Sequence, residues 1–153
     1  MQTANSRDHI VNQIAEFYNV RDELKSLTVD ELRAMTAADR LPFVVCAVSV
    51  AGDLNIGQMI RTALLTGAKE FIIYGRRKYD KRSTVGAEQY MPVTRIDGFT
   101  GPYDTKIDVD KFWVYMEERN FQPVFFETTG TSLRQFDWQS QAFRGKTPCI
   151  VLG

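Results

Sequence analysis

The sequence predicts an α/β fold, a mostly parallel β-sheet with helices on both faces, preceded by an N-terminal helical extension. Three observations support this prediction. Short apolar runs of strand length alternate with helix-like segments, as in sheets whose parallel strands are joined by helices. The first two runs are almost wholly apolar, which is typical of strands covered on both faces. A chain of 153 residues, 44% of them hydrophobic, is also long enough to bury a core of its own.

The first 40 residues predict helices and no strand. Between Asp8 and Leu27 the apolar residues recur mostly at three- and four-residue spacing, the pattern of an amphipathic helix. Thr28 and Glu31 have the spacing of a capping box, so a second helix should begin there and end near Ala38. We therefore divide the chain into a helical extension, residues 1–40, and an α/β domain, residues 41–153. The apolar face of the extension can pack either on that domain or on a partner subunit.

Five strands are expected in the α/β domain, at residues 43–50, 71–74, 92–96, 123–126 and 147–152. A helix should join the first two strands, with Asn55 as its N-cap and Gly67 as the glycine that ends it. A short helix is expected around residues 84–90, and another should begin at Asp108 or Asp110. The two cysteines, Cys46 and Cys149, fall inside strands, where buried free thiols behave as small hydrophobic groups.

The formal net charge is zero, but the charges are unevenly distributed. Residues 54–100 carry 8 basic and 4 acidic side chains, whereas the segments on both sides are net acidic. Most of the excess forms one basic cluster near two tyrosines: Arg76, Arg77, Lys78, Lys81 and Arg82. Cations interleaved with aromatic rings suit the phosphates and exposed bases of RNA. The alternative is a solvated loop without a partner.

Several classes of function lack their signature residues. His9 is the only histidine, so neither a zinc site nor a Ser/His/Asp triad is expected. Gly52 and Gly57 have the spacing of the first two P-loop glycines, but Gln58 and Met59 replace the Lys-Ser/Thr pair that contacts phosphate and magnesium. No apolar run reaches the ~20 residues needed to cross a bilayer, and the N-terminus has no secretory pattern. We therefore expect a cytoplasmic protein with no metal and no membrane contact.

A distinctive motif follows the first predicted strand. Residues 53–67 read D-L-N-I-G-Q-M-I-R-T-A-L-L-T-G, which resembles the N-x-G-x-x-x-R-T-A-x-x-x-G motif of the SpoU/TrmH branch of the SPOUT RNA methyltransferases. Residues 83–93 are similar to the S-x-G-A segment of that family, and residues 148–153 resemble the strand that opens its second motif. The three matches occur in the family's order and spacing across residues 43–153.

The resemblance implies a trefoil-knotted α/β fold, a homodimer, S-adenosylmethionine as methyl donor, and methylation of a ribose 2′-hydroxyl in tRNA or rRNA. By motif match, Arg61 would be the catalytic arginine and Asn55 its companion at the helix start. A guanidinium is a poor general base, so we expect Arg61 to stabilise a developing alkoxide or hold the neighbouring phosphate. The basic cluster would bind the RNA backbone. The expected donor-binding residues are Thr128, Thr129, Gly130, Leu152 and Gly153.

The family pattern extends beyond the strand that ends at Gly153. In the family, a glutamate follows this strand, and a further strand and a Ser-Leu-Asn motif complete the knot and most of the donor pocket. We therefore expect the natural chain to continue with these elements. The alternative is a non-catalytic RNA-binding or assembly module that keeps the α/β core and the basic cluster but lacks the knot.

Overall fold

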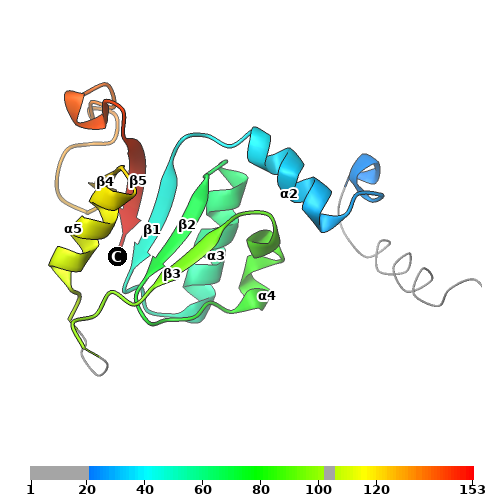
Figure 1. Cartoon of the computed structure of the whole chain (residues 1–153), viewed down its shortest axis with the longest axis horizontal. Helices are drawn as coiled ribbons and strands as arrows, with labels where there is room; N and C mark the ends of the chain where they lie inside the picture. Colours follow the sequence, from blue (N-terminus) through cyan, green and yellow to red (C-terminus); the bar gives the residue numbers. More distant parts are fainter. Residues whose placement is uncertain (1–20, 102–105) are drawn as a thin grey trace, which may run out of the picture.

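The computed structural model describes residues 21–101 and 106–153. In these residues five parallel strands form one sheet in the order β3-β2-β1-β5-β4 (Figure 1). The strands are β1 (Val44–Val48), β2 (Glu70–Tyr74), β3 (Val93–Ile96), β4 (Phe121–Phe125) and β5 (Thr147–Leu152). The helices are α2 (Val29–Ala38), α3 (Asp53–Leu65), α4 (Lys81–Thr84) and α5 (Val109–Glu118), with 3-10 turns η1 (Asp22–Leu24), η2 (Ala87–Gln89) and η3 (Gln141–Phe143). This architecture confirms the predicted fold class.

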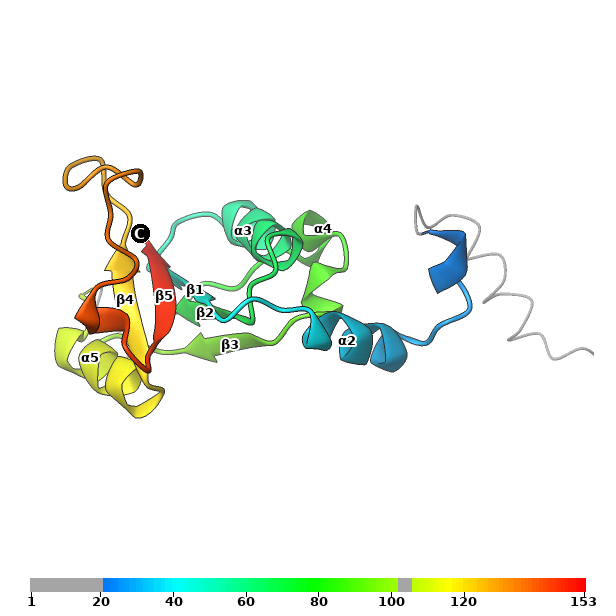
Figure 2. The same cartoon turned by 90° about the horizontal axis from the view of Figure 1, so that it is seen from above.

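Helices cover the two faces of the sheet and give it two apolar cores. Figure 2 shows α3 and α4 on one face and α5 on the other. Alternate residues of each strand face opposite sides, so in β1 Val45 packs with the α3 side while Cys46 packs with the α5 side. On the α5 side, Phe112 and Met116 pack against the sheet together with Cys149. Both cysteines are buried and free, as predicted.

Most predicted elements are confirmed to within a few residues, and two differ. The helix predicted for residues 84–90 is split into α4 and η2, because Val85 and Gly86 both adopt left-handed conformations that an α-helix cannot contain. The helix predicted to reach Leu27 does not do so, because residues 22–24 form only the 3-10 turn η1. The rest of that predicted helix, up to residue 20, lies outside the described residues.

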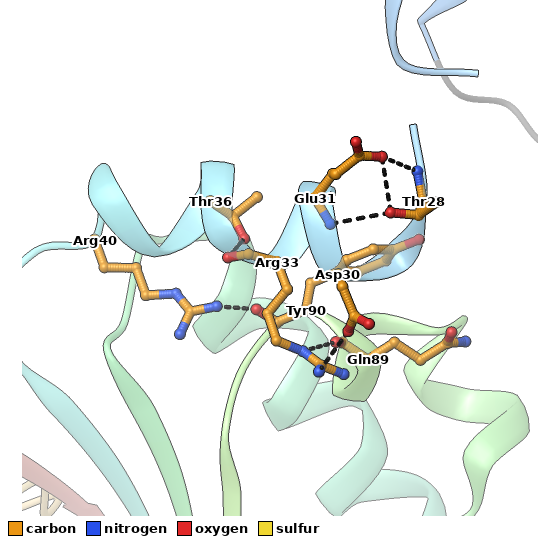
Figure 3. Close-up of polar contacts among 8 residues, drawn as sticks. All are labelled: Thr28, Asp30, Glu31, Arg33, Thr36, Arg40, Gln89 and Tyr90. Carbon is orange, nitrogen blue, oxygen red and sulfur yellow. Dashed lines mark hydrogen bonds and ion pairs between the residues drawn. The ribbon is translucent and has the colours of Figure 1, made fainter. Parts of the chain in front are cut away.

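The second predicted helix, α2, begins at the predicted capping box and packs on the α/β body. The hydroxyl of Thr28 accepts a hydrogen bond from the Glu31 amide, while the Glu31 carboxylate accepts from the Thr28 amide at 2.8 Å. Two arginines attach this segment to η2 and the residue after it (Figure 3): Arg33 Nε, from α2, donates to the carbonyl of Gln89 at 2.8 Å, and Arg40 Nη2, just after α2, donates to that of Tyr90. The α2 part of the extension therefore contacts its own α/β domain.

Candidate functional site

The motif of residues 53–67 forms α3, which starts just beyond the carboxyl end of β1. Its N-cap is Gly52, whose φ of 96° favours glycine, so the prediction that Asn55 caps the helix is wrong. Asn55 instead lies in the first turn and donates its side-chain amide to the carbonyl of Ala51 at 3.3 Å. The glycine predicted to end the helix, Gly67, follows the C-cap with a φ of 81°, as expected.

The second motif segment packs directly against α3. Asp80 caps α4 and donates its own backbone amide to the carbonyl of Asp53 at 3.1 Å. The hydrogen bonds from Arg82 to the Asp80 carboxylate lower the pKa of Asp80 and keep the cap ionised. Gly57 is buried where α4 approaches α3. The structure thus brings the first part of α3 together with α4, where the second motif segment begins, beyond the carboxyl end of β1.

The two predicted catalytic residues point in different directions from α3. They lie about 9 Å apart along the helix axis and about 120° apart around it. Asn55 lines a groove of about 530 Å³ together with Met59, Ile150 and Leu152, and Arg61 is not part of that groove. Arg61 is exposed, and its guanidinium makes no hydrogen bond or ion pair with the described part of the chain.

The five predicted donor-binding residues lie at the neighbouring carboxyl ends of β4 and β5, but they do not share one pocket. The loop residues Thr128, Thr129 and Gly130 line a pocket of about 310 Å³ beside Phe125, Phe126 and Phe136. Leu152 lines the groove of Asn55. Gly153 lies next to β1, where a Cβ atom would be 3.3 Å from the carbonyl oxygen of Val48.

The basic cluster divides into paired and unpaired cations. Arg82 forms three side-chain hydrogen bonds to Asp80, the shortest at 2.6 Å. Arg76 forms an ion pair with Asp97 at 3.3 Å. Within residues 21–101 and 106–153, no ion pair involves the other three members, Arg77, Lys78 and Lys81, all of which are exposed. These three cations are therefore available to a polyanion.

The structure adds residues that the sequence analysis did not identify. Arg95 donates to the carbonyl of Arg76 at 2.7 Å, and Lys111 donates to that of Asp97 at 2.6 Å, so both extend the positive surface. The guanidinium of Arg76 lies 4.4 Å from the ring centroid of Phe99.

The parallel pairing of Tyr74 with Ile96 puts the loops that follow β2 and β3 at one edge of the sheet. The sequence could have indicated this neighbourhood, because the predicted sheet is parallel and the carboxyl ends of parallel strands meet at one edge.

Two further observations concern other classes of site. In the described part of the chain, no group of three or more His, Cys, Asp or Glu side chains is placed to hold a metal ion. None of the helices in residues 21–101 and 106–153 is long and apolar enough to cross a membrane.

Comparison with solved structures identifies the fold. The A. aeolicus TrmH/SpoU tRNA modifying enzyme matches with a TM-score of 0.56 at 20% identity, over 82% of this chain and 58% of that one. The SpoU methyltransferase AviRb from Streptomyces viridochromogenes, in complex with AdoMet, matches with a TM-score of 0.53 at 21% identity, over 75% and 41% of the two chains. An RNA 2′-O ribose methyltransferase matches with a TM-score of 0.53 at 17% identity, over 75% and 39%.

These matches define an α/β fold with a parallel sheet, and more narrowly the fold of the SpoU/TrmH-type methyltransferases. They agree with the resemblance drawn from the motifs at the level of the fold. This chain spans 39% to 58% of the length of those three proteins. No family model and no curated protein matches the sequence.

Proposed function

We propose that the protein is an RNA methyltransferase that transfers a methyl group from S-adenosylmethionine to a ribose 2′-hydroxyl of tRNA or rRNA. One observation carries this proposal: the motif of residues 53–67 forms the helix after β1 and packs against the second motif segment, within a SpoU/TrmH-type fold. The two structurally similar proteins named above as a tRNA modifying enzyme and an RNA ribose methyltransferase support RNA as the substrate.

The loop after β4 fits part of the donor. Its pocket combines phenylalanine rings, which can stack on an adenine, with the hydroxyls of Thr128 and Thr129, which can bond to a ribose. Gly130 has no atom within 4 Å of the position of a Cβ, so its backbone is open to a ligand. The ends of β4 and β5 are linked by a hydrogen bond from the Phe126 amide to the Val151 carbonyl at 3.0 Å, so Leu152 and Gly153 would border the same donor.

Arg61 and Asn55 would act on the RNA. When bound, the donor would supply a methyl group on a sulfonium, to be taken by the ribose oxygen as the S–CH3 bond breaks, S-adenosylhomocysteine leaves and the hydroxyl proton passes to solvent. An exposed guanidinium without a partner can bind the neighbouring phosphate or the developing alkoxide. Asn55 would orient the sugar from the first turn of α3. The remaining rate acceleration would come from holding the ribose hydroxyl and the methyl group in a reactive geometry.

A homodimer is part of the proposal. The groove beside α3 is lined mainly by apolar side chains, among them Phe43, Met59 and Ile150. Such a groove is suited to burial against a second subunit. Because Arg61 faces away from that groove, it would stay exposed to RNA when a second subunit covers the groove.

Donor binding and methyl transfer test the proposal in the full-length protein. Titration calorimetry with S-adenosylhomocysteine should show binding, and labelled donor should leave methyl groups on ribose, detected as RNA linkages that resist alkaline hydrolysis. Arg61→Ala should reduce transfer about 10²- to 10³-fold. Its donor affinity and melting temperature should be unchanged because the side chain is exposed. Arg144→Ala, at another exposed arginine, is the matched control.

A folded full-length protein without donor affinity would refute the enzyme assignment. Methylation of a base in place of ribose would keep the enzyme assignment and refute the 2′-hydroxyl as the acceptor. Salt-dependent RNA binding without donor binding would instead support the non-catalytic RNA-binding module.

A further inference from the structure

A separate pocket lies at the carboxyl ends of β1 and β2. Its volume is about 240 Å³. The floor is apolar, with Ala47, Ile56 and Ile73, and the rim is formed by Ser49, Arg76 and Phe99. None of the residues proposed to bind the donor lines it.

One wall of this pocket is a cation stacked near an aromatic ring. The guanidinium carbon of Arg76 lies 4.4 Å from the centroid of the Phe99 ring. Arg76 is fixed there by its ion pair with Asp97 at 3.3 Å and by a hydrogen bond to the carbonyl of Gly101. The wall is therefore formed before any ligand binds.

The position of Phe99 depends on the residue before it. Gly98 packs on the ring of Tyr74, where a Cβ atom would lie 1.9 Å from a ring carbon. Burial raises the pKa of Tyr74 to about 12, and its protonated hydroxyl donates to the carbonyl of Asp108 at 3.3 Å. This close packing holds the loop of Phe99 over the end of β2.

We propose that this pocket binds a nucleobase of the RNA, an inference that rests on the RNA partner proposed above. An apolar floor beside a planar cation and an aromatic ring matches the flat, partly polar surface of a base. Arg77, which also lines the pocket, and the neighbouring Lys78 are exposed cations that can hold the flanking phosphates. We assign the base to RNA and not to the donor's adenine, because none of the residues proposed to bind the donor lines this pocket.

The test measures base-dependent binding by the full-length protein without donor. Two probes are titrated: oligoadenylate, and inorganic polyphosphate, which has the charge but no bases. Wild-type protein should prefer oligoadenylate. Phe99→Ala should weaken oligoadenylate binding about 5- to 150-fold and leave polyphosphate binding unchanged, because stacking on an aromatic ring is lost while the cations remain. Phe99→Trp should retain the affinity.

Matched variants separate stacking from folding. Phe99→Leu keeps an apolar side chain but removes the ring, so it should also lose oligoadenylate affinity if Phe99→Ala proves unstable. Trp113→Ala removes an exposed aromatic ring that does not line this pocket and should bind both probes as the wild type does. Equal affinity of the Phe99→Leu and wild-type proteins for oligoadenylate would overturn the proposal. So would a loss of S-adenosylhomocysteine affinity without a loss of RNA affinity.

Failure of the base-pocket proposal can be distinguished from failure of the proposed methyltransferase function. Phe99-dependent RNA binding in a protein that transfers no methyl group would refute the enzyme assignment and support the base pocket. Methyl transfer with RNA binding that does not depend on Phe99 would refute the pocket and support the enzyme.

Discussion

The side-chain oxygen of Ser83 fills the space beside Gly57: a Cβ atom on Gly57 would lie 1.7 Å from it. That Cβ would also lie 2.9 Å from the carbonyl oxygen of Asp80. The Ser83 hydroxyl is itself fixed, because it donates to the same carbonyl at 2.7 Å. The two motif segments therefore meet so closely that position 57 has no room for a side chain larger than that of glycine.

Gly57→Ala should lower the free energy of unfolding by about 1–3 kcal/mol, because the added methyl group forces α4 away from α3. Chemical denaturation of the variant checks this value. Ser83→Gly in the same protein should recover part of the loss, so the double variant should be more stable than the sum of the two single changes predicts. Strict additivity would mean that the two residues do not compete for the same space.

The arginine contacts of α2 predict a local opening of the extension. Arg40 donates to the carbonyls of Tyr90 and Lys69, the latter at 3.3 Å. Arg40→Ala should cost about 1–2 kcal/mol, because it removes charge-assisted hydrogen bonds at a half-buried site. Hydrogen exchange should speed up in α2 while protection in β1 and β2 remains. Arg21→Ala, an exposed arginine whose ion pair with Glu23 lies on the surface, is the control.

The unpaired members of the basic cluster should contribute more to RNA affinity than the paired Arg82. Lys78→Ala should weaken binding and reduce the slope of log affinity against log salt by about 0.7, the value for one contact with a single strand. Arg82→Ala should have a smaller effect because Asp80 already neutralises that guanidinium. Lys146→Ala, far along the chain before β5, should change neither quantity. Equal losses for Lys78→Ala and Arg82→Ala would contradict this ranking.

The capping box makes the start of α2 sensitive to acid. Hydrogen bonds from Thr28, the backbone one contributing most, lower the pKa of Glu31 below its ordinary value of 4.5. The ionised Glu31 carboxylate therefore stabilises the start of α2 fully above that ordinary value. This stabilisation is lost as the pH falls through the lower pKa of Glu31 in the folded protein. Hydrogen exchange of the first α2 turn should accelerate over that range, after correction for intrinsic exchange. Glu31→Gln should remove the pH dependence.

Local sequence signals were sufficient for most of the secondary structure. The capping box of Thr28 and Glu31 and the glycine after a helix, Gly67, each act within one turn of backbone, so the residues alone predicted them. For the last helix the sequence left Asp108 and Asp110 as candidate caps, and the structure selects Asp108. Asn55 shows the limit of this reasoning. It is a good N-cap by type, but Gly52 adopts the backbone conformation that starts the helix one turn earlier.

The sequence by itself determined the α/β class, the strand positions, the family resemblance and the positive charge of residues 76–82. The tertiary structure determined that β5 lies between β1 and β4, that Arg76 is paired with Asp97 and lies over Phe99, and that Asn55 and Arg61 face different directions. The reason is physical: caps and apolar periodicity depend on neighbours along the chain, whereas strand order and pockets depend on contacts between distant segments, which form only when the sheet packs.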